Sequence, residues 1–210
     1  MTKSLIIACD GEAASGKSTG AKLISRKYKL LLVNSGLLYR YASKLIIENN
    51  PKKKIPFLKK KFKKINYKKI SKLNLHTQKI DEIVGPLAKI KNIRDIMKST
   101  QRNLIKNNKR ICLEGRDIAS TILKKNPKYD IAFYFKCNLN ISAYRRWIDL
   151  KKKIPLKDVK KSLQKRSKMD KERYHSPLIK VKDAILIRTD SLNKVQMIKK
   201  MSNAIDKKFN

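Results

Sequence analysis

Apolar runs alternate with longer segments of helical periodicity along the chain. Short apolar runs without internal alternation are typical of strands buried on both faces of a parallel sheet. We expect strands at about residues 3–9, 30–33, 111–113, 129–135 and 184–187. We expect helices at about residues 17–28, 36–49, 78–107 (with a break near Gly85 and Pro86), 139–151, 156–170 and 191–208. This order predicts an α/β fold with a five-stranded parallel sheet flanked by helices.

Residues 50–80 interrupt this pattern with a strongly basic segment. They contain 12 lysines and no acidic residue. Apolar residues still recur through the segment, more often than in a disordered tail. We therefore expect a small folded insertion with a basic outer face, inside a single domain over residues 1–210 whose core comprises residues 1–49 and 81–210.

The charge of the chain raises the question of nucleic-acid binding. There are 54 Lys and Arg residues against 16 Asp and Glu, a net charge of +38. Such a charge favours contact with polyanions. However, 43 of the 54 are lysines, and the chain also holds 26 Ile and 15 Asn, all residues with A/T-rich codons. We interpret most lysines as solvated surface residues, and selected polyanion binding is the alternative.

Neither a membrane span nor a disulfide framework is expected. No apolar run approaches the roughly 20 residues that a membrane span needs, and residues 5–9 are too short for a signal-peptide core. We therefore expect a cytoplasmic protein without membrane contact. Cys9, Cys112 and Cys137 lie in apolar runs without paired spacing, which is typical of buried reduced thiols.

Residues 11–18 read Gly-Glu-Ala-Ala-Ser-Gly-Lys-Ser and match the phosphate-binding pattern G-x-x-x-x-G-K-[ST]. The pattern lies between an expected strand and an expected helix, where backbone N–H groups and the helix N-terminus attract phosphate. Lys17 would reach the β- and γ-phosphates, and Ser18 would bind Mg²⁺. Glu12 would repel a triphosphate, so we expect it to face solvent or pair with a cation. A coincidental Gly/Ser turn is the alternative.

Arginine positions carry more information than lysine positions because arginine is scarce here and alone recognises phosphate bidentately. The candidates near strand ends or loops are Arg40, Arg116, Arg145, Arg146, Arg166 and Arg173. Each alone could form a surface salt bridge, but beside a phosphate loop the set indicates a phosphate clamp. Neither His76 nor His175 is a compelling general base. That suits transfer to a phosphate, whose oxygen is already anionic, better than transfer to an alcohol.

The motifs together resemble those of bacterial cytidylate kinase, a family of nucleoside monophosphate kinases, over about residues 4–206. Five segments resemble patterns of that family. Residues 10–19 are similar to D-G-P-A-G-S-G-K-S-T, residues 34–40 to D-[ST]-G-x-x-Y-R and residues 93–102 to V-R-x(6)-Q-R. Residues 114–121 are similar to D-G-R-D-[IM]-G-T and residues 166–178 to R-x-x-R-D-x-x-R-x-x-x-P-L.

The resemblance implies a three-layer P-loop fold with a monophosphate-binding insertion at about residues 50–80 and a lid at about residues 151–165. It implies ATP-dependent phosphorylation of CMP and dCMP to CDP and dCDP by in-line transfer, with Mg²⁺. Its partners would be these nucleotides, with no specific nucleic acid, and a monomer is expected. The alternatives are a P-loop kinase with another acceptor, such as UMP, and a P-loop protein that binds nucleic acid through its basic surface.

The resemblance also implies a role for each matching residue. The ATP phosphates would contact Gly11, Glu12, Ala13, Ala14, Ser15, Gly16, Lys17, Ser18 and Thr19. CMP would contact Ser35, Arg94 and Asp117 through its base, Arg40, Arg116 and Arg173 through its phosphate, and Asp170 through its ribose. The catalytic cations would be Lys17, Arg116, Arg173, Arg166, Arg145 and Arg146. Arg94 and Asp117 suit cytosine because the base offers acceptors to an arginine and an amino donor to a carboxylate.

Several positions depart from the family pattern. Gly85 stands where the family has a base-contacting serine, Asn34 replaces an aspartate and Met169 replaces an arginine. Glu12 and Ala14 alter the phosphate loop. These departures leave the preference between CMP and dCMP open.

Overall fold

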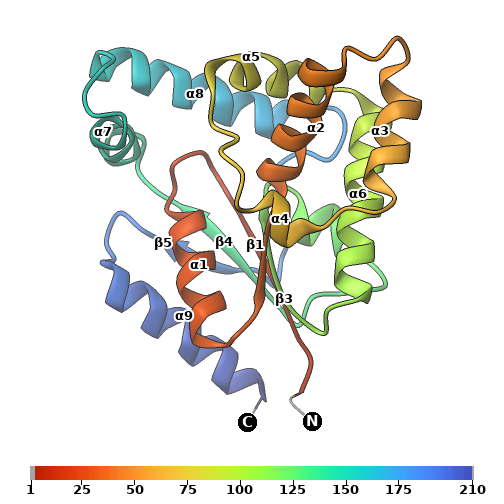
Figure 1. Ribbon diagram of the computed structural model, residues 1–210. Helices are drawn as coiled ribbons and strands as arrows, with labels where there is room; N and C mark the ends of the chain where they lie inside the picture. Colours follow the sequence, from red (N-terminus) through yellow and green to blue (C-terminus); the bar gives the residue numbers. More distant parts are fainter. Residues whose placement is uncertain (1–2, 210) are drawn as a thin grey trace. The chain divides into compact units, whose positions relative to one another are not determined.

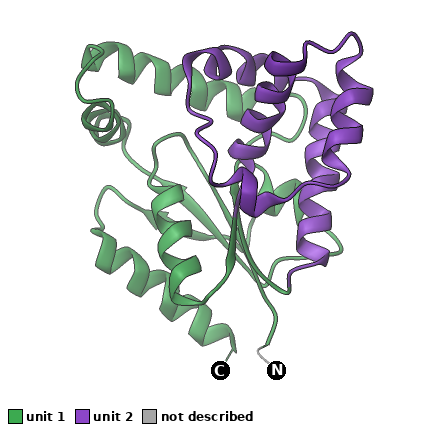
Figure 2. Cartoon of the chain, in the orientation of Figure 1, with its two compact units in different colours: residues 1–32, 109–210 green, residues 33–108 purple. Residues whose placement is uncertain are grey.

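The computed structural model describes residues 3–209, in which the chain forms two compact units (Figures 1 and 2). The first unit contains the described residues up to Leu32 and those from Lys109 onward. The second unit spans Val33–Asn108 and holds the whole basic segment of residues 50–80.

Over residues 3–209, five strands form one sheet in the order β2-β3-β1-β4-β5. The strands are β1 (Leu5–Gly11), β2 (Leu31–Asn34), β3 (Arg110–Gly115), β4 (Ile131–Lys136) and β5 (Ile185–Arg188). β1 is parallel to both β3 and β4, and β4 is parallel to β5. The predicted α/β fold with a five-stranded parallel sheet is therefore confirmed, with strand ends within two residues of their expected positions.

The main core lies between the sheet and two helices of the first unit. Helices α1 (Lys17–Lys27) and α9 (Lys194–Phe209) pack against each other and contribute buried residues to the same apolar cluster as β1, β4 and β5. Phe133 and Phe135 of β4 are almost wholly buried in it. The unbroken apolar run of β4 follows from this packing, since a strand with both faces buried has no polar side to present to water.

Three further helices of the first unit lie near the phosphate loop. The short helix η1 (Ile118–Ile122) contacts β1 and β3. Helices α7 (Leu139–Asp149) and α8 (Leu156–Glu172) pack together, and Ala13 of the phosphate loop joins their apolar cluster. The segment predicted as a lid thus comprises the turn after α7 and the first part of α8, which is anchored beside the loop.

The second unit is helical apart from its first residues. Its helices are α2 (Ser35–Asn49), α3 (Lys54–Phe62), α4 (Tyr67–Ile70), α5 (Gln78–Leu87) and α6 (Lys91–Lys106). The side chain of Asn34 caps α2 by accepting from the Leu37 backbone N–H at 3.2 Å. Leu58 and Phe62 of α3 are buried while its lysines are exposed, as expected for a folded segment with a basic outer face.

The helix break predicted near Gly85 and Pro86 is present, but it lies just beyond these two residues. Helix α5 runs through both residues to Leu87, and the chain breaks only at residues 88–90 before α6. A residue before proline is normally driven out of helical geometry by a clash that involves its Cβ. Gly85 has no Cβ, which relieves that clash and lets Pro86 sit in the last turn.

Two helical glycines provide a matched test of the packing. A Cβ on Gly20 of α1 would lie 2.5 Å from Cε1 of Phe135, a ring that is fully buried and cannot move aside, whereas a Cβ on Gly85 would meet nothing within 4 Å. We expect Gly20→Ala to lower the free energy of unfolding by about 1–3 kcal/mol through overpacking. Gly85→Ala should change it by less than about 1 kcal/mol, because the gain in helix propensity is opposed by the renewed clash with Pro86. Chemical denaturation measures both, and a stabilised Gly20→Ala would contradict the packing described.

Candidate active site

The predicted phosphate loop joins the end of β1 to the start of α1. Gly16 caps α1 in the left-handed conformation, with φ of 77°. The same conformation is adopted by Ala14, with φ of 54°, at the position where the cytidylate kinase pattern has glycine. A Cβ in this region costs about 1–2 kcal/mol. The loop thus keeps its backbone shape despite a residue that disfavours it.

Lys17, the first residue of α1, forms a buried ion pair with Glu114 of β3. Its Nζ lies 3.3 Å from Oε2 of Glu114, and the two side chains are 11% and 3% exposed. Burial lowers the pKa of Lys17, and the Glu114 carboxylate opposes that shift. β1 and β3 are adjacent and parallel. The loop after β1 and the end of β3 therefore bring a lysine and a carboxylate to the same edge of the sheet.

Arg116 fastens the segment after β3 to the phosphate loop. Its Nη1 donates to the backbone oxygens of Gly11 at 2.5 Å and Glu12 at 3.2 Å. Its Nε donates to Oδ2 of Asp170, near the end of α8, at 2.7 Å. One guanidinium therefore connects the loop, the end of β3 and α8.

Arg173 extends this charged group. Its guanidinium lies 3.6 Å from a carboxylate oxygen of Asp117 and 3.6 Å from one of Asp170, and its Nε donates to the Ser176 backbone oxygen at 2.6 Å. Two arginines and two aspartates of the predicted site are thus brought together within the first unit. Guanidinium groups held in this way by carboxylates can also bind phosphate bidentately.

The expectation that Glu12 pairs with a cation is confirmed. Lys171 of α8 lies 2.7 Å from its carboxylate, although Lys171 itself is half exposed. The pair directs the charge of Glu12 toward α8 and offsets its repulsion of phosphate.

The second unit holds the remaining predicted CMP contacts. Arg40 donates to the Leu75 backbone oxygen at 3.0 Å and to Asp81 at 2.5 Å. The Ser35 hydroxyl donates to Oε1 of Gln101 at 3.0 Å. Arg94, which is 8% exposed, donates to the Ala88 backbone oxygen at 3.2 Å. Each of these polar groups is therefore held in a defined orientation within its own unit.

Arg145 contacts the loop that follows β5. Its Nη2 donates to the Thr189 backbone oxygen at 2.9 Å, and the Thr189 hydroxyl in turn donates to the Ser15 backbone oxygen at 2.9 Å. Arg145 is thereby linked to the phosphate loop. Arg146 and Arg166 are exposed on α7 and α8.

Three residues of the site were missed by the sequence analysis as functional candidates. Glu114 pairs with Lys17, Thr189 supports the phosphate loop, and Gln101 orients Ser35. A signal existed for Glu114, because a carboxylate that ends an apolar strand beside β1 must meet the loop. Nothing in the sequence marks Thr189, which is 174 residues from Ser15 along the chain.

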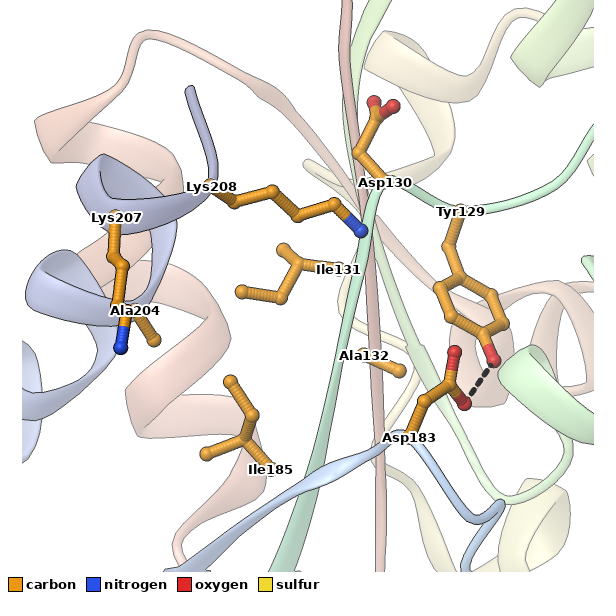
Figure 3. A pocket seen from close by; sticks show the side chains of 9 residues that line it. All are labelled: Tyr129, Asp130, Ile131, Ala132, Asp183, Ile185, Ala204, Lys207 and Lys208. Carbon is orange, nitrogen blue, oxygen red and sulfur yellow. Dashed lines mark hydrogen bonds between the residues drawn. The ribbon is translucent and has the colours of Figure 1, made fainter. Parts of the chain in front are cut away.

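One hollow on the first unit lies away from the phosphate loop. Its volume is about 250 Å³, and it is lined by residues from the starts of β4 and β5 and the end of α9, among them Asp130 and Lys208 (Figure 3). Tyr129 donates to Asp183 at 2.7 Å beside it, which together with burial raises the pKa of Tyr129. No residue of the phosphate loop lines this hollow.

Residues 3–209 offer neither a clustered metal site nor a membrane-spanning helix. No group of three or more His, Cys, Asp or Glu side chains there could hold a metal ion. None of the helices in that range is long and apolar enough to cross a membrane. Cys9, Cys112 and Cys137 are buried and free, as predicted.

Comparison with known proteins identifies the family. Residues 7–207 match the family model described as cytidylate kinase. A cytidylate kinase of Fusobacterium nucleatum is 32% identical over 97% of this chain and 98% of its own length. A bifunctional pantoate ligase/cytidylate kinase of Prochlorococcus marinus is 33% identical over the whole chain, which spans 44% of that relative.

Among solved structures, a shikimate kinase of Bacteroides thetaiotaomicron has a similar fold. Its TM-score is 0.55, with 9% identity, over 96% of this chain and 98% of that one. This likeness supports the P-loop kinase fold.

The buried pair can be tested against the half-exposed one. Removing one partner of a buried ion pair strands the other charge and costs about 3–5 kcal/mol. We expect Glu114→Gln to lower the free energy of unfolding by about that amount, and the added change Lys17→Met to restore part of it. The control, Glu12→Gln, breaks only the pair with Lys171 and should cost less than about 1 kcal/mol. Urea denaturation of the set decides, and equal costs for the two glutamines would contradict the assignment.

Proposed function

Because the chain belongs to the cytidylate kinase family, we propose that it transfers the γ-phosphoryl group of ATP to CMP and dCMP, giving CDP and dCDP. The observation that carries the proposal is the group of Arg116, Asp117, Asp170 and Arg173 fastened to a phosphate loop that holds Lys17. Such a group can recognise a nucleoside monophosphate beside a triphosphate.

The phosphate loop would bind ATP through residues 11–19. Its backbone N–H groups and the start of α1 favour the phosphates, and Lys17 would exchange part of its contact with Glu114 for the β- and γ-oxygens. Ser18 is exposed at the first turn of α1, where its hydroxyl and phosphate oxygens suit Mg²⁺. A bound Mg²⁺ would neutralise charge on the phosphates.

The acceptor phosphate would be held by arginines. Arg116 and Arg173 already lie together, and a phosphate dianion would compete with Asp117 and Asp170 for their guanidinium groups. We assign a further phosphate contact to Arg40, whose guanidinium is oriented by Leu75 and Asp81.

The cytosine would be read by complementary charged groups. Asp117 would accept from the exocyclic amine, while Arg94 and Ser35 would donate to the ring acceptors. A wrong base would leave buried polar groups unpaired, which gives strong discrimination. Asp170 would bind the ribose, with Arg166 nearby.

Transfer then needs no general base, because the attacking oxygen belongs to a phosphate that is anionic at neutral pH. The protein would align the two phosphates and neutralise charge as it develops. Lys17, Arg116 and Arg173 would supply that charge, joined by Arg145 and Arg146 from α7. The proposal includes a monomeric protein. It also includes a location in the cytosol, which three buried reduced thiols support because they suit a reducing compartment.

The acceptor is tested by measuring ADP release from ATP and Mg²⁺ with CMP, dCMP, UMP, AMP and GMP offered in turn. We expect turnover with CMP or dCMP to exceed that with the others, and Lys17→Met to lower kcat by at least about 100-fold because it removes charge at the transferring group. Lys22→Met, an exposed change on the same helix, is the control and should leave kcat unchanged. Folded, ATP-binding protein without acceptor-dependent turnover would refute the kinase proposal.

Base reading is tested at Asp117. An asparagine there can donate to the uracil oxygen that a carboxylate repels, so Asp117→Asn should lower the ratio of kcat/KM for CMP over UMP by about tenfold or more. Asp158→Asn, on the exposed start of α8, should leave the ratio as it is. An unchanged ratio in Asp117→Asn would remove Asp117 from the base site.

A further inference from the structure

Asp10 is a buried carboxylate that the proposed mechanism does not use. It precedes Gly11, the first glycine of the phosphate loop, and is 2% exposed. Its Oδ1 accepts from the Ile118 backbone N–H and its Oδ2 from the Ala119 backbone N–H, both at 2.8 Å. Both oxygens are therefore engaged by the two residues that directly follow Asp117.

Burial disfavours the ionised form of Asp10 in the folded protein. Burial raises the pKa of Asp10 to about 6, although the two backbone N–H groups and Lys17 act to lower it. The nearby Asp117 acts in the same direction as burial. Tyr129, Tyr134 and Cys9 also feel the charge of Asp10. Since the pKa lies above that of a free aspartate, ionisation disfavours folding as the pH rises from about 4 to 6. An ionised Asp10 therefore does not stabilise the fold, and its position calls for another explanation.

The segment after β3 is fastened at two points to the phosphate loop and the end of β1. One is Arg116, which donates to the Gly11 and Glu12 backbone oxygens. The other is Asp10. In the proposed reaction Arg116 would turn toward the acceptor phosphate and give up contacts to the loop, and the two bonds of Asp10 would then keep the segment in register.

We propose that Asp10 is a positioning residue for the acceptor, whose ionised carboxylate fixes the backbone at Ile118 and Ala119 and thereby orients Arg116 and Asp117 toward CMP. The inference rests on the proposed function, because it concerns how CMP is held. It assigns no contact between Asp10 and the nucleotide. ATP binding should depend on Asp10 much less than CMP binding does.

The first test uses Asp10→Asn at pH 8. Asparagine keeps the size and one acceptor oxygen, but its NH₂ group opposes one of the two backbone N–H donors. We expect KM for CMP to rise about tenfold or more, since a misplaced clamp loses binding geometry. The Kd for ATP should stay within about twofold, because the backbone cradle that binds its phosphates is retained. The matched control is Asp130→Asn. Asp130 also accepts from a backbone N–H, that of Ile6 at 2.7 Å, but it directly precedes β4 and so lies at the other edge of the sheet from Asp10. Asp130→Asn should leave KM for CMP unchanged.

The pH dependence separates positioning from a purely structural role. The ratio of KM for CMP in Asp10→Asn over that in the unaltered protein should be large at pH 8. It should approach one below pH 6, where Asp10 itself takes up a proton. Titration of the CMP phosphate affects both proteins and cancels in the ratio. A structural defect would change kcat and the Kd for ATP as well, without this pH dependence.

A measurement on the unaltered protein covers the case in which Asp10→Asn does not fold. If ionised Asp10 favours CMP binding, then bound CMP must favour ionised Asp10 to the same extent. Saturation with CMP should therefore lower the pKa of Asp10, read by carbon NMR of labelled aspartate, by about one unit for each tenfold in affinity. Simple repulsion by the CMP phosphate would raise that pKa, so the sign is decisive.

These measurements distinguish a failure of the inference from a failure of the proposed function. An unchanged KM for CMP in folded Asp10→Asn, an equal loss in Asp130→Asn, or a pKa of Asp10 that CMP leaves unchanged or raises would overturn the inference alone. Failure of the unaltered protein to phosphorylate CMP would overturn the proposed function and the inference with it. A selective rise in KM for CMP that fades below pH 6 would establish it.

Discussion

The buried ion pair between Lys17 and Glu114 is the constraint around which the candidate site is arranged. A lysine this deeply buried needs a partner, and Glu114 at the end of the neighbouring parallel strand β3 supplies one at the same edge of the sheet. The pair ties the start of α1 to the end of β3. It also places the segment after Glu114, with Arg116 and Asp117, directly beside the phosphate loop. The contact that neutralises the buried lysine therefore also positions residues of the candidate site.

The pattern of the chain was sufficient to predict the sheet and the residues at its carboxyl edge. Strand positions follow from apolar runs such as that of β4, and the phosphate loop from residues 11–18 in their strand-to-helix context. The contacts that support the loop could not be predicted. Thr189 reaches Ser15 only because the whole fold brings the end of β5 to the loop. The helix break lies slightly after Pro86 because the usual restriction on the residue before proline is relieved when that residue is glycine.

The scarce arginines and the abundant lysines differ in burial and in role. Arg116 and Arg173 are partly buried and held by carboxylates, and so keep defined orientations for phosphate. The lysines of α3 and α4 are exposed, as expected for solvated residues that raise the net charge without building a site. Of two departures from the family pattern, Glu12 is accommodated by its pair with Lys171, whereas Ala14 adopts a left-handed backbone that disfavours its Cβ.

The proposed reaction joins the γ-phosphoryl group of ATP to the phosphate of a cytidine monophosphate. Phosphorus NMR of a mixture of the protein, ATP, Mg²⁺ and CMP follows it directly. We expect the CMP signal to decline as the two signals of CDP grow, with ADP formed in equal amount and no inorganic phosphate beyond that seen without protein. Release of inorganic phosphate without formation of CDP would contradict it.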